Sequence, residues 1–471
     1  MKLLLKVVMI GMPVLFFLSC TKESFTTDPA AMITTSVDTL HFDTVFTTTG
    51  STSQFVKIIN ENDQGIKVSS VRLIDGASSP FKINVDGVPG PKVQDIEIAA
   101  HDSAYVYVTV TINPNASSLP FVVHDILEIT FNGNRKLVYM DAYGQNAHFF
   151  RNKTIGADET WNNDLPYVLI GQLTILPSAT LTINKGCKIH LHADAPLVVQ
   201  GKLLVNGEKD SASRVTFTGD RLDQPYRDYP ASYPALVFTE TAKNSVVNYA
   251  VIKNAYQGIV IAGQTASGVK LTLNETIIDN AYEQGIWALN TSINARNLLV
   301  SNCGQNILLF GGGNYNFTHA TVASFSTAYL PHKKPVLTVF DYYEQNGIKV
   351  SAPLTANFNN CIFWGEANGF TDDEVIVSKL NQTPTVTFNG VLWRMKNSLS
   401  SATTKIVGTP VNSDPLFDSI NTVKRYFDFR LEKSRSPAID AGADAGVLLD
   451  LDGNARPKGR APDLGAYEKQ R

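Results

Sequence analysis

Cysteine is scarce in this sequence, and its distribution excludes a disulfide framework. After Cys20, the remaining cysteines are Cys187, Cys303 and Cys361, which lie far apart and each within an apolar run. Disulfide scaffolds carry an even number of cysteines at regular spacings. Isolated cysteines of odd number are typical of small hydrophobic side chains in a core. We therefore expect three free, buried thiols.

Charge is also sparse. Charged residues make up 18% of the chain, and the formal net charge is −3 at pH 7. A protein that binds nucleic acid needs a basic face, so we expect no nucleic acid among the partners. Long amphipathic helical patterns are rare as well. Short runs of Val, Ile, Leu and Thr, broken by Gly, Asn and Pro, predict an all-β chain of strands and turns.

The N-terminus carries an apolar stretch with the features of an export signal. Residues 1–19 begin with Lys2 and Lys6 and continue with apolar residues 7–18, a stretch too short to span a bilayer comfortably. The letters "FLSC" that end at Cys20 resemble a bacterial lipobox. The resemblance implies that Cys20 is the acylated first residue of the mature protein, held at a membrane by its lipid chains.

Residues 20–32 are polar and turn-rich, and we interpret them as a tether between the lipid and the first domain. The pair Lys22-Glu23 resembles the signal with which some Bacteroidetes-type lipoproteins reach the outer leaflet. This resemblance implies a cell-envelope protein that is lipid-anchored, in the outer membrane, with surface exposure as a hypothesis. The membrane is then one partner.

Residues 33–147 predict an antiparallel β-sandwich. Short strand-like runs are separated by turn sequences, and "AYVYVTVTI" at 104–112 alternates with a period of two. Six or seven such runs in this length suggest a two-sheet sandwich. The succession of runs resembles Ig-like modules of the ASPM–SPD-2–Hydin type.

From residue 148 to 435 the sequence repeats itself. The clearest copies are "VIKNAYQGIVI" (251–261), "IIDNAYEQGIWAL" (277–289) and "LLVSNCGQNILL" (298–309). A repeat of 22–26 residues cannot bury its apolar face alone, but it can when it stacks on its neighbours. Three short strands per repeat predict a right-handed parallel β-helix.

Asparagines mark one corner of the predicted coil. Asn254, Asn280 and Asn302 occupy equivalent positions, where Asn tolerates left-handed backbone and can bond to the next Asn in a ladder. An inward stack of Ile252, Ile278 and Val300 should accompany this structural ladder.

Residues 436–471 contain "SPAIDAG", "DLDGNARP" and "DLGAYE" in that order. The combination resembles the closing segment of bacterial secreted β-helix proteins of the pectin-lyase-like superfamily. This resemblance supports the β-helix, and we expect the segment to cap the last coil, because a solenoid must protect its open edge.

Two long segments interrupt the repeats, at 219–236 and 326–354, and insertions of this kind commonly form the binding face of a solenoid. Flat rings beside charged groups suit sugar faces, although the same rings can pack an insertion onto the helix. The ligand-binding candidates are Arg221, Tyr226, Arg227, Tyr229, Tyr233, Tyr282 and Trp287, with Tyr256 nearby.

Evidence for catalysis is thin in the sequence. Enzymes of the superfamily act on polysaccharides, but the motifs of polygalacturonases and an acidic ladder of the pectate-lyase kind are missing. Lys253 and Asp279 precede successive corner asparagines, which suggests an exposed ion pair. Catalytic residues are therefore unassigned. The predicted role is glycan or ligand binding, or a structural role, at the cell surface. The alternatives are a lyase or hydrolase of acidic polysaccharides and an adhesin-like spacer.

No metal site is predicted. His190, His192 and Asp194 share a strand, but polar residues on the outer face of a strand are ordinary. The sequence "DLDGN" at 450–454 resembles the start of a calcium loop and lacks the later ligands, so turn and salt-bridge contacts are favoured over Ca²⁺. We expect no cofactor.

Overall fold

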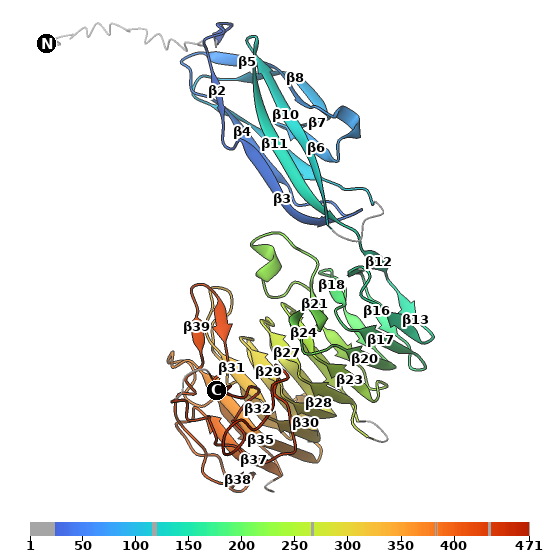
Figure 1. Ribbon diagram of the computed structural model, residues 1–471, viewed down its shortest axis with the longest axis vertical. Helices are drawn as coiled ribbons and strands as arrows, with labels where there is room; N and C mark the ends of the chain where they lie inside the picture. Colours follow the sequence, from blue (N-terminus) through green and yellow to red (C-terminus); the bar gives the residue numbers. More distant parts are fainter. Residues whose placement is uncertain are drawn as a thin grey trace, which may run out of the picture. The chain divides into compact units, whose positions relative to one another are not determined.

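The computed structural model describes residues 24–114, 120–264, 268–381, 383, 385–431 and 435–470 (Figure 1). These residues form two compact units, one within Met1–Asn113 and Phe121–Gly144, the other within Pro114–Pro120 and Gln145–Arg471. The predicted export signal, Cys20 and the first residues of the tether lie outside the described residues. Within the described ranges, no helix has the length and apolar character needed to cross a membrane.

The first unit is a sandwich of two mostly antiparallel sheets. One sheet contains, in spatial order, β1 (Phe25–Thr26), β5 (Gly65–Leu73), β10 (Phe121–Phe131), β11 (Asn134–Gln145) and β3 (Thr39–Phe46), with β8 (Lys92–Ile98) also beside β5. The other contains β2 (Ile33–Thr35), β4 (Gln54–Asn60), β9 (Ser103–Val110), β6 (Phe81–Val85) and β7 (Val88–Pro89).

Buried and outward side chains alternate along the strands of this sandwich. In β9 the side chains of Ala104, Val106, Val108 and Val110 are buried and belong to one core. The residues between them, such as Tyr105, face outward. The 3₁₀ turn η1 (Gly76–Ser78) connects β5 to β6. Strands with one apolar face pack in pairs of sheets because that face must leave water.

The second unit is a parallel β-helix, whose strands pair with their equivalents one coil away (Figure 1). We number three columns of strands in chain order. The first column contains β12 (His148–Arg151), β15 (Tyr167–Ile170), β18 (Lys188–Leu191), β21 (Val215–Gly219), β24 (Ala250–Lys253), β27 (Ile277–Asp279), β29 (Leu299–Ser301), β31 (Thr321–Ser324) and the later parts of β35 (Leu354–Gly365) and β37 (Val386–Trp393).

The second column contains β13 (Thr154–Ile155), β16 (Leu173–Ile175), β19 (Leu197–Val199), β22 (Leu236–Phe238), β25 (Ile259–Ala262), the first parts of β28 (Gln284–Arg296) and β30 (Gln305–Thr318), β32 (Leu337–Phe340) and β36 (Val375–Ser378). The third contains β14 (Glu159–Trp161), β17 (Thr180–Asn184), β20 (Lys202–Asn206), β23 (Ser245–Asn248), β26 (Leu271–Asn274), the later parts of β28 and β30, the first parts of β35 and β37, and β38 (Thr404–Val407).

Like side chains stack inside the helix. Ile252 pairs in register with Ile278, and Ile278 with Val300, and all three are fully buried. The predicted fold class, all-β with a parallel β-helix after an antiparallel sandwich, is thereby confirmed. Cys187, Cys303 and Cys361 are free and buried in the same core, as expected.

The predicted second insertion, 326–354, is not a single excursion. Residues 325–336 form a loop after β31, but Leu337–Phe340 then returns to the helix as β32. A separate antiparallel hairpin follows, made of β33 (Tyr342–Gln345) and β34 (Ile348–Ser351). The apolar run "VLTVF" explains the difference, because its residues supply the core positions that this coil needs.

The C-terminal segment does not sit where we expected a cap. Its apolar residues pack on the outer face of the first-column strands, in a cluster that joins Leu299 and Ile362 with Leu451 and Tyr467. The segment also reaches earlier coils, because the Leu451 carbonyl accepts a hydrogen bond from Arg214 at 2.6 Å. The segment therefore fastens several coils together from the side.

Buried charges organise this C-terminal segment. Arg456 lies 3.5 Å from Glu468 and also contacts His319 of the helix. Asp450 accepts hydrogen bonds from the backbone N–H groups of Asp452 and Glu468. Asp452 pairs with Arg430 at 2.7 Å, so the two carboxylates of "DLDGN" make turn and ion-pair contacts, respectively.

Candidate functional site

The floor of the candidate site is the outer face of the first column. Lys253 on β24, Asp279 on β27 and Ser301 on β29 pair in register, so their side chains stand in a row on the outside of the helix. These strands alternate, with one set of side chains in the core and the other outward. The sequence thus places an ammonium, a carboxyl and a hydroxyl group on adjacent rungs.

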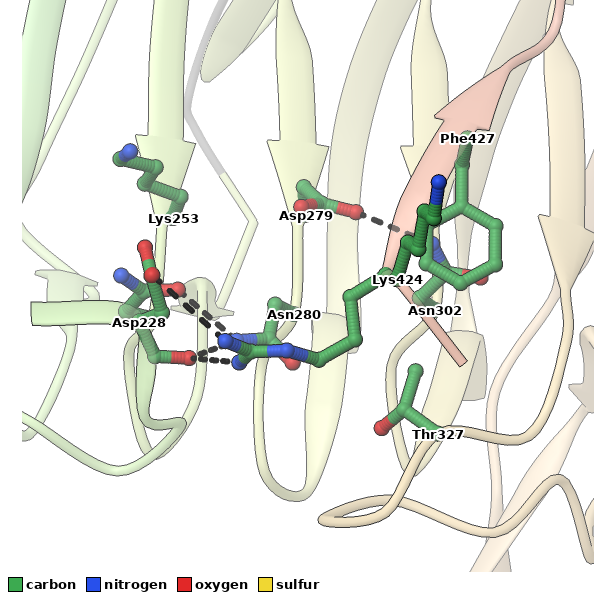
Figure 2. A pocket seen from close by; sticks show the side chains of 10 residues that line it. Asp228, Lys253, Asp279, Asn280, Asn302, Thr327, Lys424 and Phe427 are labelled. Atoms are coloured by element: carbon green, nitrogen blue, oxygen red, sulfur yellow. Dashed lines mark hydrogen bonds and ion pairs between the residues drawn. The ribbon is translucent and has the colours of Figure 1, made fainter. Parts of the chain in front are cut away.

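Segments from distant parts of the chain surround this floor. The insertion after β21 carries the 3₁₀ turn η3 (Tyr226–Asp228), the loop after β31 contributes Thr327, and a hairpin of β39 (Ser419–Asn421) and β40 (Tyr426–Asp428) closes another side. Together they enclose a cavity of about 190 Å³ (Figure 2). Its lining is Asp228, Lys253, Asn254, Asp279, Asn280, Asn302, Thr327, Lys424, Arg425 and Phe427.

The corner asparagines anchor both loops. The Asn254 amide donates a 2.8 Å hydrogen bond to the Arg227 carbonyl, and the Asn280 amide donates one of 3.1 Å to the Asp228 carbonyl. Asn280 also donates to the Asn254 side-chain oxygen at 2.8 Å, which forms one step of a ladder.

Asn302 does not continue the ladder. Its side-chain oxygen accepts a 3.1 Å bond from the Phe325 N–H at the start of the later loop, and its amide faces Asp279 at 3.5 Å. All three corner asparagines have positive φ, between 51° and 66°. The left-handed backbone turns each amide outward to where the loops can dock.

Aromatic contacts tie the loops to each other. Tyr226 packs edge-on against Tyr229, and Tyr229 packs against Tyr329 with 4.6 Å between ring centroids. The Arg221 guanidinium lies 4.1 Å above the Tyr226 ring, and that of Arg425 lies 4.7 Å above Tyr329. The two loops and the hairpin are therefore one connected wall.

Two carboxylates face the cavity in different surroundings. Asp228 lies 3.6 Å from the Arg425 guanidinium, which also donates to its carbonyl at 3.3 Å. Asp279 accepts a 2.6 Å hydrogen bond from Ser301. Burial raises the pKa of Asp279, and the Ser301 hydrogen bond and the Lys253 charge oppose that rise.

The cations outnumber the carboxylates in this lining. Lys253, Lys424 and Arg425 face Asp228 and Asp279. Arg425 is paired, but the ammonium groups of Lys253 and Lys424 make no hydrogen bond or ion pair with any residue that the structure describes. Two positive charges are thus available to a ligand.

The predicted candidates divide into three groups. Arg221, Tyr226, Arg227 and Tyr229 lie in the insertion beside the cavity. Tyr282 and Trp287 lie outside the lining: Tyr282 stacks on Tyr256 at 5.6 Å, and Trp287 packs edge-on against Phe310 at 4.7 Å.

The ligand-binding prediction is wrong for Tyr233. Its side chain is only 1% exposed and belongs to the core of the helix. Its backbone joins the coil through a bridge to Ala255, which turns the ring inward. Proline and tyrosine are frequent in the insertion at 219–236, so the sequence has no apolar–polar alternation there that could show which ring is buried.

Sequence reasoning also missed residues that line the cavity. Asp228, Thr327, Lys424, Arg425 and Phe427 were not candidates. Asp228 had a signal, because it lies beside the candidate residues of the first insertion. The hairpin residues had no such signal in the sequence, since about 150 residues separate them from the strands that form the floor of the site.

The histidine strand shows separate polar contacts. His192 lies 2.6 Å from Asp220, while Asp194 accepts from the Gly171 N–H at 3.0 Å. His190 is buried, and this burial lowers its pKa to about 4. No group of three or more His, Cys, Asp or Glu residues suited to a metal ion occurs in the described ranges.

These features define a parallel β-helix protein with a polar, partly cationic cavity on its side. No family model matches this chain, and no curated protein matches it. Among solved structures, the catalytic unit of a GH87 α-1,3-glucanase from Streptomyces thermodiastaticus is similar over 76% of this chain and 89% of its own, at 9% identity and a TM-score of 0.22.

Two further structures resemble a smaller part. A PapD-like domain of human CEP192 matches over 26% of this chain and 89% of its own, with 11% identity and a TM-score of 0.18. A family 123 glycoside hydrolase from Clostridium perfringens matches at 12% identity and a TM-score of 0.19, and the match spans 26% of each chain. Scores this low carry no conclusion about activity.

Proposed function

We propose that this protein is a lipid-anchored protein of the cell envelope that binds an acidic glycan in the cavity on the side of its β-helix. The observation that carries the proposal is the pair of ammonium groups, of Lys253 and Lys424, that share one cavity and make no direct hydrogen bond or ion pair with a described residue. Ammonium groups without partners favour ligands with carboxylate or sulfate groups.

The rest of the lining suits a sugar. Asn302 and Thr327 add hydrogen-bonding groups, and Phe427 adds an aromatic ring. Sugars present hydroxyl groups at their rim and apolar C–H groups on their faces, so amides and rings complement them. A cavity of about 190 Å³ is smaller than the roughly 300–1,000 Å³ of sites for drug-sized molecules, which fits one acidic sugar unit of a longer chain.

The test is binding of alginate oligosaccharides to the full chain, measured by calorimetry, for Lys253→Gln/Lys424→Gln. Each substitution removes one charge-assisted contact, so the double variant should bind about tenfold or more weakly. Lys188→Gln is the matched control, since Lys188 is exposed on the same column but outside the cavity. Unchanged binding by the double variant, or no binding by the wild type to any acidic glycan, contradicts the proposal.

A second candidate function, glycoside hydrolysis, is favoured by Asp279. Burial raises the pKa of Asp279, which is the direction a general acid needs, and Asp228 supplies a second carboxylate in the same cavity. Release of reducing ends that Asp279→Asn abolishes while oligosaccharide binding persists would support this function. An adhesin-like spacer is left if neither binding nor cleavage is found.

A further inference from the structure

A second aromatic surface lies in the sandwich, on the outer face of the sheet that contains β4, β9 and β6. Phe55 of β4 stands opposite Tyr107 of β9 in the strand register, and Tyr105 lies two residues before Tyr107. Although these are large apolar rings, Phe55 is 47% exposed and Tyr107 is 44% exposed.

The three rings form one continuous platform. The centroids of Phe55 and Tyr105 are 5.5 Å apart, those of Phe55 and Tyr107 are 6.2 Å apart, and those of Tyr105 and Tyr107 are 5.9 Å apart. The planes of the two tyrosines are within 15° of parallel. Neighbouring rings in contact expose more apolar surface than isolated surface residues do, and such patches commonly mark interaction sites.

Positive charge surrounds the platform. Lys57 lies opposite Tyr105 in the register, with its ammonium 4.9 Å from the ring centroid. Lys82 of the neighbouring strand lies opposite Thr109, and it is exposed. Neither lysine makes an ion pair with a residue that the structure describes.

None of the outward side chains of β4, β9 and β6 is a carboxylate, although the Asp86 carboxylate just beyond β6 accepts a hydrogen bond from the Tyr105 N–H at 3.0 Å. The outward side chains of the three strands are, in β4, Phe55, Lys57 and Ile59; in β9, Ser103, Tyr105, Tyr107 and Thr109; and in β6, Lys82 and Asn84. All of them are aromatic, basic, hydroxyl-bearing, amide-bearing or aliphatic. The charge and the rings therefore point to the same kind of ligand, one with apolar faces and negative groups.

We propose that this platform is a second glycan-binding site, which takes a chain of acidic sugars. The C–H faces of successive sugars pack on Phe55 and Tyr107, and their carboxylates pair with Lys57 and Lys82. Stacking on rings and charge-assisted hydrogen bonds are the two interactions that such a polymer offers. This site is independent of the helix cavity, because its residues belong to the other unit.

The test is retention of the full chain on immobilised alginate, compared for Phe55→Ala/Tyr107→Ala and for Tyr139→Ala. Tyr139 is the matched control, since it is a 53% exposed tyrosine on β11 of the opposite sheet. We expect the double variant to bind about tenfold more weakly and the control to bind like the wild type. Cross-strand rings also stabilise sheets, so thermal unfolding must show that both variants are folded.

Lys57→Gln/Lys82→Gln tests the charge without loss of the rings. This variant should lose affinity for alginate, and the wild type should lose affinity for alginate whose carboxyl groups have been reduced to alcohols. Equal binding of the two polymers overturns the proposal. So does an aromatic variant that keeps its alginate affinity but loses binding to vesicles of phosphatidylglycerol and phosphatidylcholine, because the platform would then contact lipid.

A background variant separates the two sites. In Lys253→Gln/Lys424→Gln, the remaining alginate binding should fall further when Phe55 and Tyr107 are replaced. If the aromatic substitutions weaken binding and the cavity substitutions do not, the platform stands and the cavity function fails. The reverse result overturns the platform alone.

Discussion

Replacement of Asn280 tests whether the corner asparagines hold the first insertion against the helix. The Asn280 amide connects two structures: it bonds to the Asp228 carbonyl of the insertion and to Asn254 on the previous coil. Asn280→Gly removes both bonds but keeps a residue that accepts the observed φ of 56°. Asn280→Ala removes the same bonds and adds backbone strain.

The magnitudes follow from these contacts. Each lost hydrogen bond is worth roughly 0.5–1.5 kcal/mol, so Asn280→Gly should lower the free energy of unfolding by about 2 kcal/mol. Alanine in a left-handed conformation costs about 1 kcal/mol more, so Asn280→Ala should lower it by about 3 kcal/mol. The difference between the two variants measures the backbone term by itself.

Trypsin provides the local assay, because Arg221 and Arg227 lie in the insertion. Cleavage there under native conditions should be several-fold faster in Asn280→Gly than in the wild type. Asn316→Ala is the control: Asn316 donates to Asn294 at 3.0 Å and accepts from Asn357 at 2.9 Å in a ladder on another face, and among the described residues its side chain bonds only to that ladder. If Asn280→Gly and the wild type are cleaved at the same rate, the insertion is held by other contacts, and the docking role is refuted.

Other consequences can be checked separately. Arg456→Met leaves the buried Glu468 without its cation, so we expect a loss of about 3–5 kcal/mol in the free energy of unfolding at pH 7, measured by denaturant titration. Burial raises the pKa of Glu468, so protonation at lower pH should recover part of this loss, and equal losses at both pH values would contradict the reasoning. Burial raises the pKa of Asp279, so its carboxylate takes up a proton at a higher pH than an ordinary aspartate does, and affinity for a sulfated oligosaccharide should rise as the pH is lowered from neutral but stay flat in Asp279→Asn. Cys20→Ala should move the protein from the membrane to the soluble fraction, and unchanged partitioning would refute lipidation. Tyr233→Phe removes a buried hydroxyl with no partner among described groups, so the melting temperature should hold or rise.

The helix itself could be predicted because its constraints are local and periodic. A coil of 22–26 residues returns each apolar side chain to the position above its equivalent, so the stack of Ile252, Ile278 and Val300 was visible as a repeat. The left-handed corner was visible for a similar reason, since asparagine recurs where that backbone is needed.

The site could be predicted only in part, because contacts outside the sequence repeat bring its residues together. Insertions are visible in the sequence as breaks in the repeat, and the first break contains Asp228. The hairpin with Lys424 and Arg425 lies at the cavity where Phe427 and Phe429 pack with Phe325 of the later loop. Such long-range contacts depend on the packing of particular apolar residues, which carry no periodic signal.

The position of the cavity nevertheless has a simple geometric cause. The first insertion follows β21 and the later loop follows β31, and both are first-column strands, so both segments leave the helix at the same corner. Between them lie the coils of β24, β27 and β29, whose corners are short and begin with asparagine. Parallel rungs are spaced by about 4.8 Å, so the two longer loops leave the helix four rungs, or roughly 19 Å, apart. Their Tyr229 and Tyr329 rings meet beside the three short corners between them. The same row of asparagines that permits the tight corners supplies the amides that fix the loops on either side. The cavity of this helix therefore lies where one corner is lengthened on two coils and kept short on those between.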